Sequence, residues 1–358
     1  MTDGFLASSV RRLARNFILA GLLGLAVVAG FFWLEGRYLY NFFHGPFPID
    51  RSAVLSMRDA SSLHNYFVTL QGDETLETGR QEVSTEYFIT THSPILALRL
   101  GDRLLLVKSS DDTAATALSG ALTSIPNDMY EGVVKSLYNA HPELNGKFLP
   151  VMLDATSFRR DGYFGITFGI LLGGLWIWML FAGLRWRSEP ATHPVYKKLA
   201  RFGSPQQLEM DLDAQFRGCG GGEAIGSARL APMWLVNQRA FSLTVMRTAD
   251  VVWVYPRVVK HYHGFIPTGK SFSIIAYDRS GAMTEIAVKK KTSADALKAI
   301  GNRAKNAIFG YSPALIQLWR KNRAQFIQQV DAKIAQANQA AVAKHEALKS
   351  EERTLVRV

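Results

Sequence analysis

One stretch of the chain satisfies the phosphate-binding loop pattern GxxxxGK[ST], through Gly264, Gly269, Lys270 and Ser271. Such a loop needs a strand before it and a helix after it, so that backbone N–H groups and the helix N-terminus converge on the phosphates. Residues 271–277 instead have the β-branched and aromatic composition of a strand. Asp278 follows Lys270 too closely to lie on a separate parallel strand as a magnesium ligand. We therefore interpret the stretch as a hairpin connection and expect no cofactor.

The remaining reactive side chains form incomplete sets. His261 and His263 alternate on a predicted strand and share a face, but no third ligand stands nearby, so we expect no metal site. Cys219 lies among glycines without a histidine partner and is expected to be an incidental thiol. Asp211 and Asp213 lie two residues apart on a predicted helix, so they point to different faces and do not form an acid–base pair. We expect no catalytic residues.

Two clusters of charge are candidates for binding. An acidic stretch would suit a cation or a basic partner, although solvated strand edges explain it as well. Its members are Asp73, Glu74, Glu77, Glu82 and Glu86. A basic run could interact with anionic lipid headgroups, although a solvated strand end is the simpler interpretation. Its members are Lys289, Lys290 and Lys291, and no aromatic residues alternate with them as single-stranded nucleic acid would require.

Two apolar segments must position these residues. Residues 162–184 contain no charged side chain, and residues 17–34 form a second apolar run. Because a helix rises about 1.5 Å per residue, both segments suit a hydrocarbon core of roughly 30 Å. We therefore predict two transmembrane helices. Cleavage of the first as a signal peptide is the alternative, but its apolar run continues through Trp33 without the break that a cleavage site needs.

The second predicted span carries three glycines at every fourth position, Gly165, Gly169 and Gly173. This spacing forms a smooth stripe that lets two membrane helices approach closely, and it makes a homo-oligomer through this helix a candidate. Glycine is also common in membrane helices that do not associate. The sequence leaves both interpretations open.

Charge divides unevenly between the segments that flank the two spans. Residues 35–161 carry 11 Lys and Arg against 16 Asp and Glu, whereas the residues after 184 carry 27 against 13. Arg11, Arg12 and Arg15 precede the first span, and Arg185 and Arg187 follow the second. The positive-inside rule then predicts an inner-membrane protein with both termini in the cytoplasm. This topology accounts for the net charge of +11 without a nucleic-acid partner.

The segment between the spans predicts a small β-barrel-like domain outside the cytoplasm. Its short β-branched runs are separated by turn residues and are followed by one helix. The expected strands are residues 66–71, 82–90, 95–100, 103–108 and 116–123, and the expected helix is residues 127–140. The single cysteine excludes an internal disulfide, so this domain must be stable without one.

The segment after the second span predicts a second α+β domain. A helix over residues 204–216 precedes several strands, and a helix over residues 293–307 closes the unit. The expected strands are residues 228–236, 241–246, 251–262, 271–277 and 283–288. Residues 312–349 read as one long helix opened by Ser312-Pro313, either as a partial coiled coil or packed on its own domain.

Three apolar stretches carry a resemblance to known proteins: Met233-Trp-Leu, Asp250-Val-Val-Trp-Val-Tyr and Phe309-Gly-Tyr-Ser. Over residues 190–330 the chain resembles an uncharacterised bacterial family of two-span membrane proteins with a pleckstrin-homology-like cytoplasmic domain. The resemblance implies that fold and carries no catalytic residue. Together with the two spans, this predicts an arm (1–16), a first helix (17–34), an outer domain (35–161), a second helix (162–184), a pleckstrin-homology-like domain (185–311) and a C-terminal helix and tail (312–358).

These features predict a membrane-anchored binding, sensor or scaffold protein rather than an enzyme. Its expected partners are membrane lipids and other membrane or cytoplasmic proteins. A structural subunit of a membrane complex is an alternative. A second alternative is an enzyme whose site is assembled from unrecognised loops, which would appear as a deep polar pocket with strongly shifted carboxylates.

Overall fold

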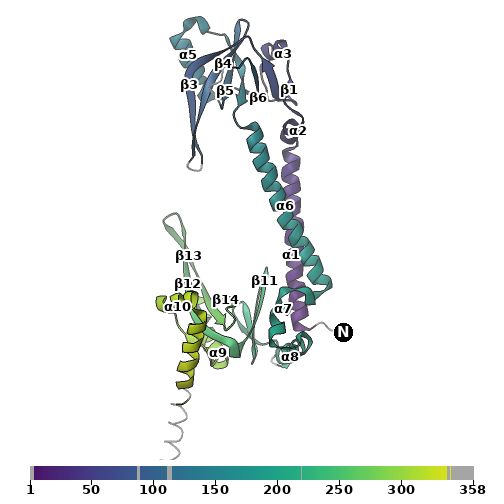
Figure 1. Cartoon of the computed structure of the whole chain (residues 1–358), viewed down its shortest axis with the longest axis vertical. Coiled ribbons are helices and arrows are strands. Elements are labelled where there is room, and N and C mark those ends of the chain that lie inside the picture. Colours follow the sequence, from purple (N-terminus) through teal and green to yellow (C-terminus); the bar gives the residue numbers. More distant parts are fainter. Residues whose placement is uncertain (1–3, 87–88, 111–114, 219, 337–338, 340–358) are drawn as a thin grey trace, which may run out of the picture. The chain divides into compact units, whose positions relative to one another are not determined.

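The computed structural model describes residues 4–86, 89–110, 115–218, 220–336 and 339 (Figure 1). The chain forms two units. Unit 1 comprises Met1–Gly21 and Trp178–Val358, and unit 2 comprises Leu22–Ile177. The structure is mixed α and β with several sheets, which confirms the predicted fold class at that level. Cys219 lies outside the described residues.

Each predicted span lies within one long helix, α1 (Phe5–Leu34) or α6 (Phe158–Ser188). Both helices are long and apolar enough to cross a membrane. Only 17% of the most apolar window of α1 and 6% of that of α6 is buried in the structure. Their leucine, phenylalanine and tryptophan side chains are therefore largely exposed, unlike those of a soluble core helix.

Most of the arm predicted over residues 1–16 is helical in the described part. α1 already begins at Phe5, whose backbone N–H donates to Oδ1 of Asp213 on α8 (Pro205–Gly218). A carboxylate at this end satisfies a free N–H group and is favoured by the helix dipole. Leu6 and Val10 are fully buried against α7 (Pro194–Leu199) and α8. The start of α1 thus belongs to the core of unit 1.

Unit 2 is built on a seven-stranded mixed sheet in the order β1-β2-β6-β7-β5-β4-β3. The strands are β1 (Phe47–Pro48), β2 (Phe67–Gln71), β3 (Glu74–Glu86), β4 (Ile89–Leu100), β5 (Arg103–Ser109), β6 (Ala117–Ser124) and β7 (Phe148–Ala155). The predicted strands at 66–71, 103–108 and 116–123 are close to β2, β5 and β6. The expected strand over 82–90 divides between β3 and β4, and residues 87–88 lie outside the described part.

Two hydrophobic cores cover the two faces of this sheet. On one face α3 (Arg51–Leu55) contributes Val54 to a core with Leu98 and Leu105. On the other face lies the predicted helix, present as α4 (Asn127–Met129), a π-helical stretch (Tyr130–Val134) and α5 (Lys135–Ala140). The short helix α2 (Gly36–His44) follows α1. β1 and β3 are the two edges of the sheet, so the expected small barrel is not confirmed.

Unit 1 contains two four-stranded sheets, ordered β11-β10-β9-β8 and β14-β13-β12-β15. The strands are β8 (Glu223–Ile225), β9 (Ala228–Leu230), β10 (Trp234–Arg239), β11 (Ser242–Arg247), β12 (Val251–His263), β13 (Ile266–Asp278), β14 (Met283–Val288) and β15 (Ile308–Phe309). The single strand expected over 228–236 is two strands, and β13 begins five residues before the expected start.

The helix α9 (Ser293–Arg303) closes the core between these two sheets. Ile300 of α9 packs with Leu235 of β10 and with Val254 and Ile286 of the second sheet. The opposite face of the second sheet carries the aromatic side chains Trp253 and Tyr277, and α10 (Pro313–Lys321) lies over them through Trp319.

The predicted long C-terminal helix is interrupted. α10 opens as expected, with Ser312 Oγ accepting the Leu315 N–H at 3.2 Å, but it ends at Lys321. Asn322 has an extended φ of −149°, and its Oδ1 accepts the Gln325 N–H at 3.1 Å as the cap of a second helix over 323–336. Phe326 then packs beside Trp319. In the described part the segment therefore packs on its own domain, and its residues beyond 339 lie outside that part.

Candidate functional site

An arginine-lined pocket of about 480 Å³ lies in unit 1 between α1 and the sheet of β9 and β10. Its lining comes from two parts of the chain more than 200 residues apart. The lining residues are Phe5, Ser8, Ser9, Arg12, Asn16, Ser227, Arg229, Val236, Gln238, Arg239 and Ala240.

The helical side of the pocket follows from the spacing of residues on α1. Ser9, Arg12 and Asn16 recur at three- and four-residue intervals and therefore share one face. The neighbouring face carries the buried Leu6 and Val10, which fasten α1 to the core. The polar face is thereby held over the sheet instead of turning freely to solvent.

Two hydrogen bonds fix α1 on β10 and on the turn that follows it. Gln238 Nε2 donates to the carbonyl oxygen of Ser9 at 3.1 Å, and Asn16 Nδ2 donates to the carbonyl oxygen of Ala240 at 2.8 Å. One residue further along, the rings of Phe17 and Phe241 meet edge to face at 5.7 Å. The turn between β10 and β11 therefore lies against the residue at which the apolar run of α1 begins.

The pocket is strongly cationic. Arg12, Arg229 and Arg239 line it, and no Asp or Glu is among its described lining residues. Arg239 is partly compensated by Glu285, 3.7 Å away, which also pairs with Arg257 at 3.0 Å. Guanidinium groups present several N–H donors in a planar fork that matches phosphate oxygens. The arrangement suits an anionic group such as a phosphate.

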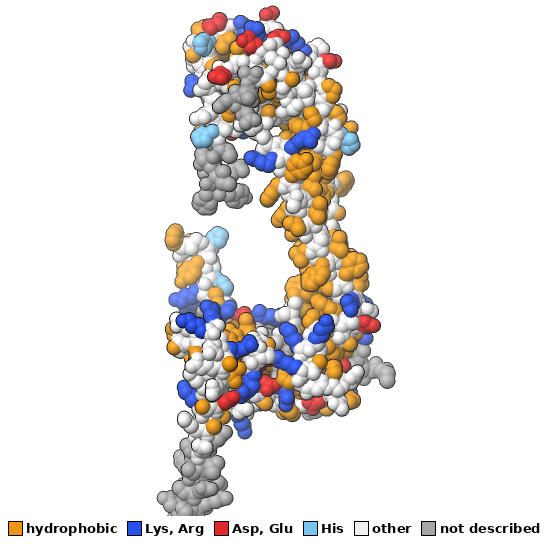
Figure 2. All heavy atoms as spheres, viewed as in Figure 1, with side chains coloured by type: hydrophobic (Ala, Val, Ile, Leu, Met, Phe, Trp, Pro, Cys, Tyr) orange, Lys and Arg blue, Asp and Glu red, His pale blue; other side chains and the backbone are white. Residues whose placement is uncertain are grey.

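A second hollow of about 300 Å³ adjoins the pocket and is lined by Arg11, Arg12, Arg15 and Arg187. Arg12 is common to both. The first three come from α1 and the last from the final turn of α6, so the start of one apolar helix and the end of the other both contribute. Figure 2 shows Lys and Arg side chains gathered on unit 1 where the apolar surface of its helices ends.

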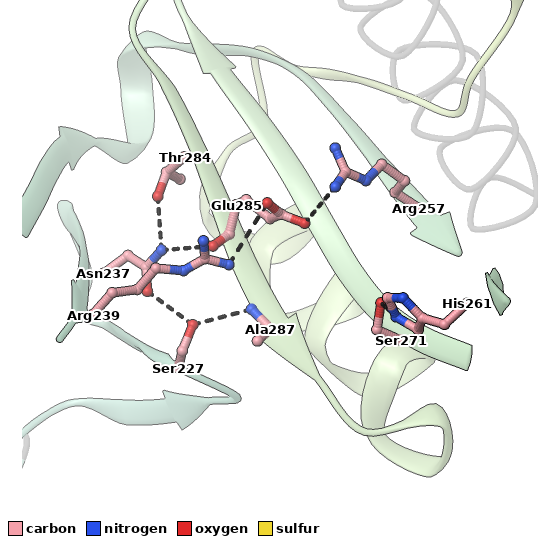
Figure 3. Close-up of polar contacts among 9 residues, drawn as sticks. All are labelled: Ser227, Asn237, Arg239, Arg257, His261, Ser271, Thr284, Glu285 and Ala287. Atoms are coloured by element: carbon pink, nitrogen blue, oxygen red, sulfur yellow. Dashed lines mark hydrogen bonds and ion pairs between the residues drawn. The ribbon is translucent and has the colours of Figure 1, made fainter. Parts of the chain in front are cut away.

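Behind the pocket, a buried polar network joins the two sheets of unit 1 (Figure 3). Ser227 Oγ donates to Asn237 Oδ1 at 2.9 Å, and Asn237 Nδ2 donates to Thr284 Oγ1 at 2.9 Å and to the Glu285 carbonyl oxygen at 2.8 Å. Asn237 is only 4% exposed, and its side-chain oxygen and nitrogen both have partners. Since Ser227 lines the pocket, the network supports the pocket wall.

The phosphate-loop motif lies at the end of the β12–β13 hairpin. Gly264 is in the turn with φ +61°, whereas Gly269, Lys270 and Ser271 lie within β13 and pair with β12. A strand therefore follows the loop where a phosphate-binding loop would have a helix. His261 Nε2 lies 3.0 Å from Ser271 Oγ across the same hairpin, and His263 is exposed near its end. Within the described residues, no group of three potential metal ligands was found.

The predicted acidic candidates make structural contacts. Asp211 Oδ2 accepts the indole N–H of Trp234 at 3.1 Å, while Asp213 binds the N-terminus of α1. Asp73 pairs with Arg51, whose hydrogen bond holds the pKa of Asp73 below its usual value. Further pairs are Glu74 with Arg99 at 3.0 Å and Glu82 with Lys108 at 2.9 Å. The Glu86 side chain lies outside the described part, and Glu77 is exposed.

Hydrogen bonds hold the pKa of four carboxylates below the usual value, and these are Asp59, Asp73, Glu143 and Asp331. These groups are therefore ionised at neutral pH, as in structural pairs.

The two predicted interaction features lie in different surroundings. Lys289, Lys290 and Lys291 are exposed where β14 leads into α9. Of the glycine stripe, Gly169 faces Phe32 of α1, and an added Cβ would lie 2.3 Å from the Phe32 ring. Gly165 and Gly173 have nothing within 4 Å of such a Cβ. The middle glycine therefore serves the packing of α1 on α6 within one chain.

Sequence reasoning missed the pocket. Arg11, Arg12 and Arg15 were recognised only as charges flanking a span, and Arg229 and Arg239 were not singled out. The available signal was the three- and four-residue spacing of Ser9, Arg12 and Asn16 before the apolar run. No known protein family, curated protein or solved structure matches this chain.

Proposed function

We propose that this chain is a two-span protein of the bacterial inner membrane whose arginine-lined pocket binds the anionic headgroup of a membrane phospholipid. The carrying observation is the place of the pocket: Asn16, which lines it, is followed at once by the apolar run beginning at Phe17. Headgroup phosphates lie at this boundary in a membrane. Three arginines at that level match their charge.

Membrane spanning is supported by exposure as well as by composition. The apolar windows of α1 and α6 are largely unburied, so water would meet these side chains unless lipid covers them. The basic residues of unit 1 favour the cytoplasmic side under the positive-inside rule. Both termini are then cytoplasmic.

A pleckstrin-homology-like fold for unit 1 is part of this proposal. The antiparallel sheets β8–β11 and β12–β14, with α9 over the core between them, are consistent with the resemblance. Unit 2 then lies outside the cytoplasm. The whole chain acts as a membrane-anchored binding or sensor protein with one domain on each side.

The experiment is a thermal melt of the purified full-length protein in detergent with three additives at equal concentration. They are short-chain phosphatidylglycerol, short-chain phosphatidylcholine and inorganic phosphate. A ligand that binds only the folded state raises Tm, so phosphatidylglycerol should raise it and phosphatidylcholine should not. A rise with inorganic phosphate alone would assign the pocket to a free anion. Equal responses to both lipids would refute headgroup recognition.

A further inference from the structure

The hairpin of β12 and β13 extends beyond its sheet as an isolated two-stranded ribbon. β14 pairs with β13 only as far as Phe272, and β15 pairs with β12 only at Trp253 and Val254. Residues 259–271 therefore pair only across the ribbon itself. Every residue from 260 to 271 is exposed. Figure 1 shows this ribbon standing out from unit 1.

The end of the ribbon is apolar. Phe265 in the turn is fully exposed at 102%, Ile266 is 70% exposed and Tyr262 is 58% exposed. Val258 adds a further apolar side chain, 52% exposed, nearer the sheet. Turn positions in soluble domains usually carry polar residues or glycine, so three large apolar side chains gathered at one hairpin end indicate a surface that is covered in use.

The shaft of the ribbon is basic. Lys260 and Lys270 lie on it, and no Asp or Glu occurs from residue 251 to residue 277. Lys260 pairs with Lys270 across the two strands, which places two like charges opposite each other. Such a pair is unfavourable in isolation, but an anionic surface relieves the repulsion.

We propose that the tip of this ribbon, formed by Tyr262, Phe265 and Ile266, enters the headgroup boundary of an anionic membrane while Lys260 and Lys270 contact its phosphates. An apolar tip above a basic shaft matches the apolar and anionic layers of that boundary. The inference rests on the proposal that α1 and α6 cross the membrane, which keeps unit 1 beside it. A second copy of this basic unit would repel the two lysines. An anionic lipid surface accommodates both the lysines and the apolar tip and is therefore favoured.

The ribbon enters only to a shallow depth. Beyond the β12–β13 pairing, its outer edges carry backbone N–H and carbonyl groups without a partner strand, and hydrocarbon cannot satisfy these groups. The tip side chains therefore reach the acyl boundary while the edges stay among headgroups and water. This contact is separate from the arginine-lined pocket.

The test places a fluorophore on the tip of the full-length protein in vesicles. Cys219 is replaced by Ser, Phe265→Cys carries an environment-sensitive dye, and the vesicles contain phosphatidylglycerol, phosphatidylcholine and a lipid with a shallow spin-label quencher. The matched control is Ser280→Cys in the turn that follows β13 at its other end. Twelve residue steps at about 3.3 Å place the two ends of β13 about 40 Å apart.

Quenching at position 265 should be several-fold stronger than at 280, and stronger with the shallow quencher than with one near the acyl end. Lys260→Glu with Lys270→Glu should reduce it, as should vesicles of phosphatidylcholine alone. The protein should remain in the vesicles after an alkaline wash, as a protein with two spans does. If it remains and quenching is equal and weak at both positions, the ribbon contact alone is overturned. Loss of the protein from the vesicles in that wash would instead contradict the proposed spans.

Discussion

The side-chain amide nitrogen of Asn16 lies 2.8 Å from the carbonyl oxygen of Ala240, a residue 224 positions later in the chain. This bond joins the last polar residue before the apolar run of α1 to the turn between β10 and β11. It therefore fixes the position of the first sheet of unit 1 along the axis of α1. The arginine-lined pocket exists because the two are held together.

Replacing Asn16 by Ala should weaken this attachment. The Ala240 carbonyl loses a partner, and the free energy of unfolding should fall by about 1 kcal/mol. The measurement is the thermal midpoint of full-length protein in detergent, with Gln317→Ala on the exposed face of α10 as the control. An unchanged midpoint for Asn16→Ala would show that this hydrogen bond does not contribute to the attachment of α1.

Asn237→Ala should cost more than a surface substitution. The change removes a buried side chain and leaves Thr284 and the Glu285 carbonyl without their donor, which is worth about 1–3 kcal/mol. The measurement is the free energy of unfolding by chemical denaturation. Thr284→Val, which loses only one hydrogen bond of the network, is the variant for comparison. A smaller effect for Asn237→Ala than for Thr284→Val would contradict the central role given to Asn237.

His193 should make stability depend on pH. Burial, followed by the charge of Lys198, lowers the pKa of His193 from 6.5 to about 4, and its Nδ1 accepts the Val195 N–H at 3.1 Å. Because the unfolded chain binds this proton more readily, stability is complete above pH 6.5 and falls as the pH drops toward 4. The total loss is on the order of 3 kcal/mol.

The variant His193→Asn tests this pH dependence. It keeps a side-chain acceptor for the Val195 N–H and cannot titrate. Its thermal midpoint should therefore decline less than that of the wild type between about pH 7 and pH 5, since other groups titrate alike in both. Parallel declines would mean that folding does not lower the pKa of His193.

Gly169→Leu should separate α1 from α6, since a Cβ at this position would already lie 2.3 Å from the Phe32 ring. Gly173→Leu is the matched control, because it faces open space. Thermal stability should fall for the first and stay unchanged for the second. Oligomer size by light scattering tests the separate prediction of association: a smaller particle for Gly173→Leu would support the stripe as an interface between copies.

The sequence predicted elements whose signal is local. The apolar runs of both long helices, the cap at Ser312-Pro313 and most strands of unit 1 fall near their expected positions. β7 was missed because Pro150 interrupts its apolar run, and proline is unusual in a central strand. The structure places Pro150 where the register between β5 and β7 shifts, so the irregularity accommodates it.

The pocket could not be predicted because its two walls are distant in sequence. Ser9 and Gln238 are 229 positions apart, and neither residue type suggests the other. The break at Asn322 was missed for a different reason. The apolar spacing of Trp319 and Phe326 continues across the break, since both sides pack on the same aromatic face of the second sheet.

The most direct test of headgroup binding is native mass spectrometry of the detergent-purified protein, counting phospholipids that stay bound. Wild-type protein and Arg320→Ala, an exposed control on α10, should retain phosphatidylglycerol in preference to phosphatidylcholine. Arg12→Ala and Arg239→Ala should each lower retention about fivefold, and the double variant further, at about 1 kcal/mol per arginine. Retention of phosphatidylglycerol that is unchanged in the double variant would contradict the assignment of the pocket.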